Sequence, residues 1–412
     1  MVPSTRLLSL LTAFLWLANE AGSMPTCKPG NEGAAAVGKA IYFLTNDNAN
    51  AVVAVPIGND GTLSKGAATM TGGAGSVGVD AQGQPATPDA LISQSSLTVA
   101  GHHIFAVNAG SNTLSMLSIS RSDPTKLSVV GAPVQIPGEF PNTVAASTKN
   151  KLVCVGTTGA KAGISCSSFS KKGLGAMDDL RPFDLGQTTP PVGPTNTVSQ
   201  TLFSEDESLL FTMVKGDPAQ NKTGFLSALA VQQSSDANGA AVMTLARDDT
   251  RSSPNGTAVL FGSQVIPGTS NVFATDASFG AAILSVDPAS CEATTVATGN
   301  VDGQKATCWV AISPATKTAF VTDVGRNRLV EMSTDDASIV GTLDLSCNGD
   351  PGLIDLAAAG NFIYALSPGN GTTQAAVTVV DVSGGSGSAK MVQHFELAGL
   401  AGKTAQGMKV LA

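Results

Sequence analysis

One short apolar pattern recurs seven times along this chain, and the repetition constrains the possible folds more than any other feature. Each copy has a few β-branched or aromatic residues followed by a polar, Gly-rich turn, as in residues 40–45 (AIYFLT). The copies occupy residues 40–45, 103–108, 152–157, 209–214, 271–276, 318–323 and 361–366. Their spacing of roughly 45 to 60 residues is typical of the repeated sheets, or blades, of a β-propeller.

Apolar runs on both sides of each copy predict units of four strands. A second strand follows across a short turn, as at residues 328–332, and an outer strand comes next, as at 129–136. The inner strand of each unit comes before the copy, and examples are residues 89–93, 142–147, 197–203, 307–313 and 353–356. We therefore predict an all-β, seven-bladed β-propeller with four-stranded antiparallel blades that bury their faces against each other. The alternative is a pair of β-sandwiches, which the regular spacing disfavours.

The two ends of the repeating region predict how the ring closes. The first unit, near residue 39, has no inner strand of its own, and residues 406–411 (QGMKVL) supply an unassigned strand. We expect this C-terminal strand to pair with the first blade and close the ring, the alternative being a frayed tail. The predicted organisation is a signal peptide (1–23), an N-terminal extension (24–37) and a single propeller domain (38–412).

Composition excludes several classes of function. The 412 residues include 45 Gly and 21 Pro, only 13% are charged, and the net charge is −8. Such a chain favours β structure with many turns over long charged helices. An acidic surface without a Lys/Arg stripe repels phosphate backbones, so we expect no nucleic-acid partner. No second apolar run after the N-terminus is long enough to span a membrane, and we expect a monomer.

The N-terminus predicts export. Arg6 precedes an apolar run at residues 7–18, and small residues follow it. This order is typical of a cleaved secretory signal, the alternative being an uncleaved anchor. We therefore expect a secreted protein, either extracellular or in the cell wall.

Export makes disulfides and glycans possible. Cys154 and Cys166 lie on predicted neighbouring antiparallel strands, and we expect them to pair. The partners of Cys27, Cys291, Cys308 and Cys347 stay open, and no Cys/His spacing indicates zinc. Glycosylation sequons begin at Asn221, Asn255 and Asn370.

Ligands of propellers usually bind where loops meet at one mouth of the central channel, and this placement nominates polar residues by fold analogy. The nominated residues are Asp47, Asp89, Glu139, Asn142, Lys161, Asn196, Lys215, Asp217, Asp276, Trp309, Asp323, Arg326, Asp350 and Gln406. We select Asn142, Asn196, Lys215, Trp309 and Arg326 as ligand-binding residues, since cations and amides could hold a carboxylated molecule. For each the alternative is a solvated turn residue. No metal is predicted, although Asp276 and Asp323 leave a carboxylate site open.

The three histidines are predicted to lie away from this mouth. His102 and His103 precede a second strand at the opposite end of a blade, and His394 lies on an outer strand. This placement excludes Ser-His-Asp and Cys-His catalysis. A loop at residues 71–88 contains GAGSVG (73–78), but no helix is predicted after it, so nucleotide binding is not expected.

Four segments carry a family resemblance. They are residues 139–144 (EFPNTV), 188–197 (TTPPVGPTNT), 273–280 (FATDASFG) and 364–371 (YALSPGNG). They resemble the secreted fungal 3-carboxymuconate cyclase-like proteins, which belong to the lactonase-type seven-bladed β-propellers, and the resemblance extends from about residue 38 onward. It implies cycloisomerisation of a muconate to a lactone, or lactone hydrolysis, without metal or other cofactor.

The resemblance also implies a site that this chain changes. The enzymes typically carry Pro-His at the start of an inner strand, whereas this chain has Pro141-Asn142, and an amide cannot exchange a proton near neutral pH. Glu139 is the candidate catalytic acid in its place, if burial raises its pKa. Two hypotheses remain: a muconate cycloisomerase (lactonizing) or lactonase acting on a carboxylated small molecule or a lactone, and a non-catalytic secreted or cell-surface glycoprotein that binds a ligand or partner.

Overall fold

The computed structural model describes residues 37–235, 239 and 241–412. The predicted signal peptide and Cys27 lie outside the described residues, as does nearly all of the predicted extension. In the described part of the chain, no helix has the length and apolar character needed to cross a membrane.

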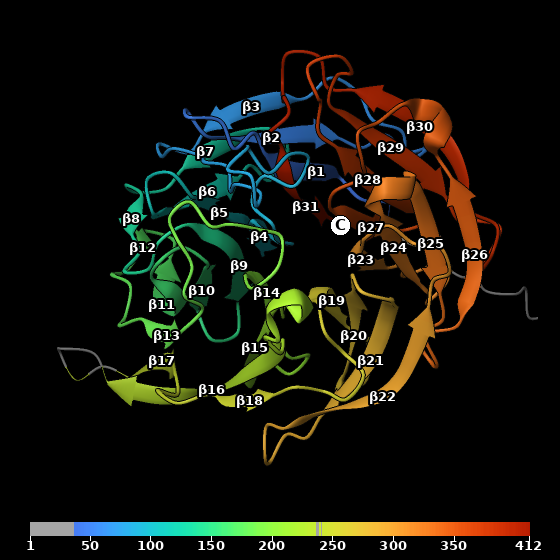
Figure 1. Ribbon diagram of the computed structural model, residues 1–412. Coiled ribbons are helices and arrows are strands. Elements are labelled where there is room, and N and C mark those ends of the chain that lie inside the picture. Colours follow the sequence, from blue (N-terminus) through green and yellow to red (C-terminus); the bar gives the residue numbers. More distant parts are fainter. Residues whose placement is uncertain (1–36, 236–238, 240) are drawn as a thin grey trace, which may run out of the picture. The chain divides into compact units, whose positions relative to one another are not determined.

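Seven antiparallel sheets stand around a central axis (Figure 1), as the seven repeats predict. The innermost strands are β31 (Gln406–Leu411), β4 (Leu97–Ala100), β9 (Pro141–Ser147), β14 (Val198–Phe203), β19 (Leu260–Val265), β23 (Thr307–Ile312) and β27 (Leu356–Ala359). The second strands are β1 (Ala40–Leu44), β5 (His103–Asn108), β10 (Leu152–Thr157), β15 (Leu209–Val214), β20 (Asn271–Asp276), β24 (Ala319–Asp323) and β28 (Phe362–Ser367). The seven sequence copies are these second strands, to within a residue at each end.

Two further layers complete each sheet. The third strands are β2 (Ala51–Pro56), β6 (Thr113–Ile119), β11 (Ala162–Ser170), β16 (Phe225–Ser235), β21 (Gly280–Val286), β25 (Arg328–Met332) and β29 (Ala376–Asp381). The outer strands are β3 (Ala67–Met70), β7 (Leu127–Val129) with β8 (Val134–Gln135), β12 (Gly173–Leu174) with β13 (Arg181–Phe183), β17 (Ala241–Leu245) with β18 (Thr250–Ser252), β22 (Ala293–Asn300), β26 (Ile339–Asp344) and β30 (Lys390–Glu396).

The second strands are apolar almost throughout because both of their faces are covered. All six residues of β10 and all five residues of β1 are buried. One apolar cluster contains residues of β1, β5 and β10, which belong to three consecutive sheets. Burial between sheets therefore stabilises every unit through its neighbours, as expected for radial repeats.

The C-terminal strand closes the ring, as predicted. β31 pairs with β1 in antiparallel register, with Ile41 opposite Val410. The Lys39 amide also donates to the Leu411 carbonyl at 2.6 Å. Without β31 the first sheet would present β1 as an unpaired inner edge.

Three predicted strands have different limits in the structure. The predicted inner strand at 89–93 is wrong, because Ile92 (φ 59°) and Ser95 (φ 65°) have left-handed backbones and the strand begins only at β4. The strand predicted at 353–356 begins at Leu356, just after the left-handed Asp355 (φ 56°). The outer strand predicted at 129–136 is divided into β7 and β8, since Gly131 (φ 73°) turns the chain between them.

A long connection from β3 to β4, residues 71–96, lies at one end of the central channel. Its last part, residues 89–96, crosses the channel, and we call it the plug. The Gln94 amide donates to the Ser199 carbonyl at 2.9 Å, and the Ser95 carbonyl accepts from the Val144 amide at 2.8 Å. The side-chain Nε2 of Gln94 also donates to the Val310 carbonyl of β23 at 2.8 Å, so the plug is bonded to inner strands on different sides of the channel and divides it into two spaces.

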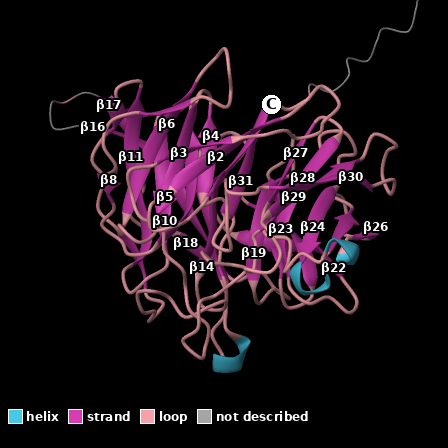
Figure 2. Ribbon diagram, turned by 90° about the horizontal axis from the view of Figure 1, so that it is seen from above, coloured by secondary structure: helices cyan, strands magenta, loops and turns pink. Residues whose placement is uncertain are grey.

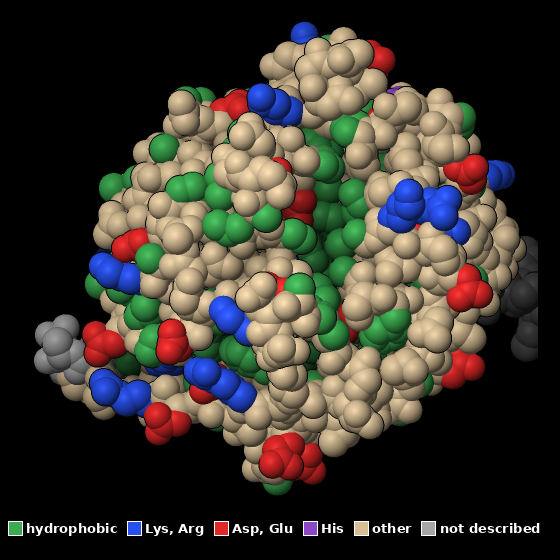
Figure 3. Space-filling model, in the orientation of Figure 1, with side chains coloured by type: hydrophobic (Ala, Val, Ile, Leu, Met, Phe, Trp, Pro, Cys, Tyr) green, Lys and Arg blue, Asp and Glu red, His purple; other side chains and the backbone are tan. Residues whose placement is uncertain are grey.

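We call the end where the inner strands begin the mouth. Three one-turn helices, η1 (Pro218–Gln220), η2 (Val324–Arg326) and η3 (Ser346–Asn348), lie toward this face in Figure 2. Figure 3 shows the same face hollowed near its middle, where hydrophobic side chains gather.

Candidate functional site

The mouth pocket lies between the plug and the inner strands on the mouth side. Its volume is about 280 Å³, and apolar side chains make up most of its wall. Asp89 and Ile92 of the plug, Lys215 after β15, Phe261 of β19, and Cys308 and Trp309 of β23 line it. A volume slightly below the usual range for ligand pockets, with few polar groups, suits a small organic molecule.

Lys215 is the cation of the mouth pocket. Its side chain is 1% exposed, and Nζ donates to the Ile92 carbonyl at 2.6 Å. Nζ also lies 4.1 Å from the centroid of the Phe261 ring, within cation–π range. Burial lowers the pKa of Lys215, and the nearby carboxylate of Asp89 opposes this shift.

Asp89 is the acid of the same pocket. Burial raises the pKa of Asp89, and the charge of Lys215 opposes the rise. Its Oδ1 is buried and has no hydrogen-bond partner among the described residues. A buried carboxylate oxygen without a donor is costly, so this atom can accept a hydrogen bond from a ligand or from water.

Aromatic rings and a thiol form the rigid wall. Trp309 and Phe261 pack edge to face, with centroids 4.7 Å apart, and Trp309 Nε1 donates to the Ser93 carbonyl at 3.0 Å. Burial, with the charge of Asp89, raises the pKa of the Cys308 thiol, which therefore stays protonated and acts as a small apolar group. The tryptophan holds both the plug and the pocket wall in place.

Of the predicted ligand-binding residues, three gather around the plug. Lys215 and Trp309 line the mouth pocket. Asn142 is buried behind it, where Nδ2 donates to the carbonyls of Leu91 (3.2 Å) and Val198 (2.7 Å). The amide of Asn142 thus positions the plug.

The other predicted site residues lie outside the mouth pocket. Glu139 Oε1 lies 3.5 Å from Lys161 Nζ, and Glu139 Oε2 accepts from Thr189 Oγ1 at 2.7 Å. Asn196 Nδ2 donates to the Leu185 carbonyl at 2.8 Å, and Arg326 Nε donates to the Gly303 carbonyl at 2.9 Å. The structure does not bring these three residues together, and their roles stay predictions.

The carboxylates of Asp276 and Asp323 serve their local turns. Asp276 Oδ2 accepts from the amides of Ala258 and Val259, at 2.7 and 3.0 Å. Asp323 Oδ2 accepts from Arg328 Nε at 2.8 Å. Each carboxylate therefore already accepts hydrogen bonds from nearby residues.

None of the three histidines lines the mouth pocket. His102 and His103 lie at the start of β5, and His394 lies on β30. His394 Nε2 lies 3.1 Å from Asp350 Oδ1, and this hydrogen bond raises the pKa of His394. Asp350, which the sequence predicts at the mouth, therefore binds the outer strand β30 through His394.

The disulfide and the sequons have clear positions. Cys154 and Cys166 form a disulfide between opposite residues of β10 and β11, which is the pairing expected from the sequence. The asparagines of the three sequons, Asn221, Asn255 and Asn370, are exposed. All three lie on connections at the mouth end of the sheets.

Sequence reasoning missed two members of the pocket and the plug itself. Phe261 stands in an ordinary apolar strand, and Cys308 could be read only as a possible disulfide partner. The repeat places Asp89 at the mouth, but its sequence position alone does not mark it as a ligand-binding residue. The available signal was the polar run Ser93-Gln94-Ser95-Ser96, which is unsuited to an apolar inner strand.

No family model and no curated protein sequence matches the chain. Among solved structures, a candidate 6-phosphogluconolactonase from Bacteroides fragilis is similar, with a TM-score of 0.56 and 10% identity over 91% of this chain and 98% of its own. A second candidate 6-phosphogluconolactonase, from Bacteroides uniformis, gives a TM-score of 0.54 and 14% identity over 70% of this chain and 80% of its own.

A third solved structure, a protein of unknown function from Desulfotomaculum acetoxidans, has a TM-score of 0.56 and 12% identity, covering 91% of this chain and 99% of its own. At such low identities these similarities establish a shared fold. Fold and site together define the class: a seven-bladed β-propeller with a small pocket at its plugged mouth.

Proposed function

We propose that this protein is a secreted, lactonase-type propeller that hydrolyses a small uncharged lactone in the mouth pocket. The observation that carries the proposal is the partnerless Oδ1 of Asp89 in a pocket that also contains the buried ammonium of Lys215. The sequence resemblance to lactonase-type propellers, and the fold shared with two candidate 6-phosphogluconolactonases, support the same class of reaction.

The charges of the pocket favour a neutral substrate over a muconate. Among the described residues, the charged ones that line it are Asp80, Asp89 and Lys215. A di- or tricarboxylate needs several cations, and neither Lys161 nor Arg326 is among the lining residues. A lactone without acidic substituents has no net charge and places its apolar ring against Phe261 and Trp309.

The reaction uses both buried groups. Asp89 accepts a proton from water while the water oxygen bonds to the lactone carbonyl carbon, and Lys215 stabilises the negative charge that develops on the carbonyl oxygen. When the ring C–O bond breaks, Asp89 returns the proton to the departing alkoxide. The product is a hydroxy acid, which then ionises.

The test is hydrolysis of a panel of uncharged five- and six-membered lactones, followed by pH-stat titration. Asp89→Asn and Lys215→Met should each reduce kcat/KM by about 100-fold or more. The control is Asp335→Asn, which removes an exposed carboxylate beyond β25 and should leave the rate unchanged. A wild-type rate equal to buffer, with the fold intact by circular dichroism, would exclude this function.

The pH dependence of kcat/KM and a Glu139 variant distinguish Asp89 from Glu139, the acid predicted from the sequence. Because the pKa of Asp89 is raised and that of Lys215 is lowered, kcat/KM should rise and fall within a narrow bell around neutral pH. A loss of activity in Glu139→Gln with retention in Asp89→Asn would assign the chemistry to Glu139 instead.

The second candidate function is a non-catalytic, secreted or cell-surface glycoprotein that binds a small ligand. The absence of an imidazole from the described lining of the mouth pocket favours it, and the three exposed sequon asparagines at the mouth end fit a glycoprotein. Calorimetric binding of a lactone without product formation, lost in Asp89→Asn, would support this alternative.

A further inference from the structure

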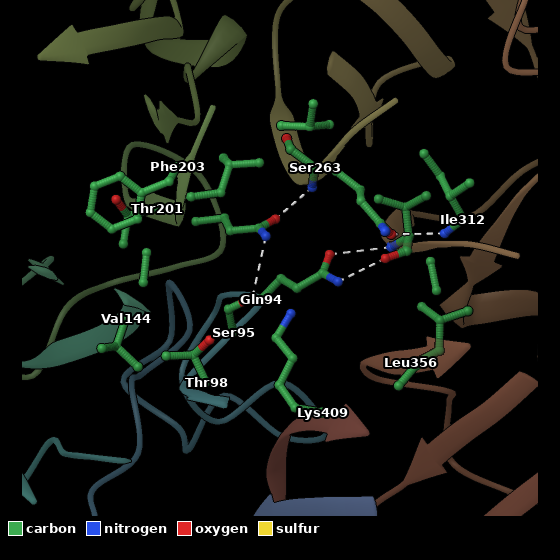
Figure 4. A pocket seen from close by; sticks show the side chains of 18 of the residues that line it. Gln94, Ser95, Thr98, Val144, Thr201, Phe203, Ser263, Ile312, Leu356 and Lys409 are labelled. Carbon is green, nitrogen blue, oxygen red and sulfur yellow. Dashed lines mark hydrogen bonds between the residues drawn. The ribbon is translucent and has the colours of Figure 1, made fainter. Parts of the chain in front are cut away.

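A second space, the axial chamber, lies on the other side of the plug from the mouth pocket. Its volume is about 380 Å³. All seven innermost strands contribute to its wall, and Gln94 and Ser95 of the plug form its end toward the mouth (Figure 4). The chamber is therefore a feature of the ring axis and not a crevice between two blades.

Glutamine side chains make the plug end of the chamber rigid. Gln94 bonds to both backbone groups of Val310, with Nε2 donating to the carbonyl at 2.8 Å and Oε1 accepting from the amide at 3.2 Å. Gln200 Oε1 accepts from the Ser263 amide, and Gln200 Nε2 donates to Ser95 Oγ at 3.2 Å. A polar space fixed in this way is preorganised for a ligand.

Lys409 of β31 is the one charged residue that lines the chamber in the described part of the chain. Its side chain points into the chamber, toward the plug end (Figure 4). Within the described residues, its ammonium has no hydrogen bond and no carboxylate within 4.0 Å. Burial lowers the pKa of Lys409, and the more distant charge of Asp355 opposes this.

Asp355 does not neutralise Lys409 by direct contact. Its Oδ2 accepts from the amides of Met408 (2.9 Å) and Ser95 (3.4 Å), and its Oδ1 accepts from the amide of Leu356 (2.9 Å). These three donors already stabilise the carboxylate. The ammonium of Lys409 therefore faces the chamber with its donors available.

Further donors and apolar side chains line the same chamber. Thr98 Oγ1 and Gln264 Nε2 make no hydrogen bond within the described part of the chain, although Gln264 Oε1 accepts from the Ile312 amide at 2.8 Å. Leu202 and Val410 supply apolar surface. We propose that the axial chamber binds a small organic monocarboxylate, with its carboxylate on Lys409 and its apolar body against the surrounding strands.

The test uses benzoate as the probe, with isothermal titration calorimetry and saturation-transfer NMR on the mature protein. Lys409→Met, which keeps the length of the side chain, should weaken binding at least tenfold, whereas Lys409→Arg should retain it. The matched control is Lys403→Met, an exposed lysine just before β31, which should bind as the wild type does. Benzyl alcohol, which lacks the charge, should bind at least tenfold more weakly than benzoate.

A second variant and a structure locate the probe. Thr98→Val is isosteric and should weaken benzoate about threefold through the loss of one hydroxyl. A crystal structure with benzoate should place the carboxylate next to Lys409. Absence of binding, equal binding by Lys409→Met, or benzoate in the mouth pocket would each overturn the proposal, and none of these outcomes depends on lactone hydrolysis.

Discussion

The buried carboxyl group of Asp355, beside the plug, makes stability depend on pH. Burial raises the pKa of Asp355 from its ordinary 3.8 to about 6, with Lys409 and three backbone amides opposing the rise. The folded protein therefore binds a proton at Asp355 more tightly than the unfolded chain does. The contribution of this residue to stability is fully present below about pH 4 and is lost as the pH rises through about 6.

Replacing Asp355 with Asn should remove this pH dependence. The wild type should lose about 3 kcal/mol of unfolding free energy relative to Asp355→Asn between pH 4 and pH 7, because the two pKa values above differ by about two. Urea unfolding of both proteins at several pH values measures the difference. The same pH slope in both proteins would contradict the assignment.

The plug also depends on Gly262, which has no side chain. A Cβ at Gly262 would collide with Gln94 Oε1 and would lie 2.5 Å from the Cys308 carbonyl oxygen. Gly262→Ala should therefore displace the plug and destabilise the fold by about 1–3 kcal/mol. Hydrogen exchange should become faster in residues 89–96, while Gly402→Ala, whose Cβ meets nothing within 4 Å, should leave it unchanged. Unaltered exchange in Gly262→Ala would show that the plug does not depend on this glycine.

At the scale of strands, the disulfide joins two that are already hydrogen-bonded neighbours. Cys154 on β10 lies opposite Cys166 on β11, twelve residues later in the chain. Closing so short a loop restricts the unfolded chain, and the double variant Cys154→Ser/Cys166→Ser should lose about 3 kcal/mol. The control is Cys347→Ser, an exposed thiol, and chemical unfolding of all three proteins measures the effect. A double variant as stable as the wild type would mean that the bridge adds nothing to packing already present.

The strands were predictable from sequence to different extents. β5, β10 and β15 coincide with their sequence copies because nearly all of their residues are buried and most of them are apolar. The plug was not predictable, since it is held by inner strands that are distant in the sequence, as with the bond between Gln94 and Val310, 216 residues apart. Local patterns contain no information about such distant partners.

The candidate site shows the same limit. The places of Lys215 and Trp309 in the repeat predict that they lie at the mouth, and both line the pocket. The sequence does not identify Lys409 as a ligand-binding residue. Lys409 lies on an inner strand, and only the register of β31 with β1 shows that its side chain faces the channel. The residues of a site on the ring axis can be identified only when the closure of the ring is known.

For the whole molecule, the plug connects the two spaces that could hold ligands. On the mouth side, the Ile92 carbonyl accepts a hydrogen bond from the ammonium of Lys215. Three residues later, Ser95 borders the axial chamber. The closing strand belongs to the same arrangement, since Gln406 Nε2 donates to the Pro88 carbonyl at 3.1 Å and Lys409 enters the chamber. Ring closure is therefore a condition for both spaces as well as for stability.

Removal of residues 406–412 should open the ring. The first sheet would retain only β1, β2 and β3, so that the backbone of β1 and the apolar residues that Met408 now covers would face water. The truncated protein should lose at least 10 °C in Tm, or aggregate, while removal of Ala412 alone should change Tm little. A synthetic peptide of residues 404–412 should restore part of the lost stability by adding the missing strand in trans. If the truncated protein unfolds at the wild-type temperature and the peptide has no effect, β31 does not close the ring in solution.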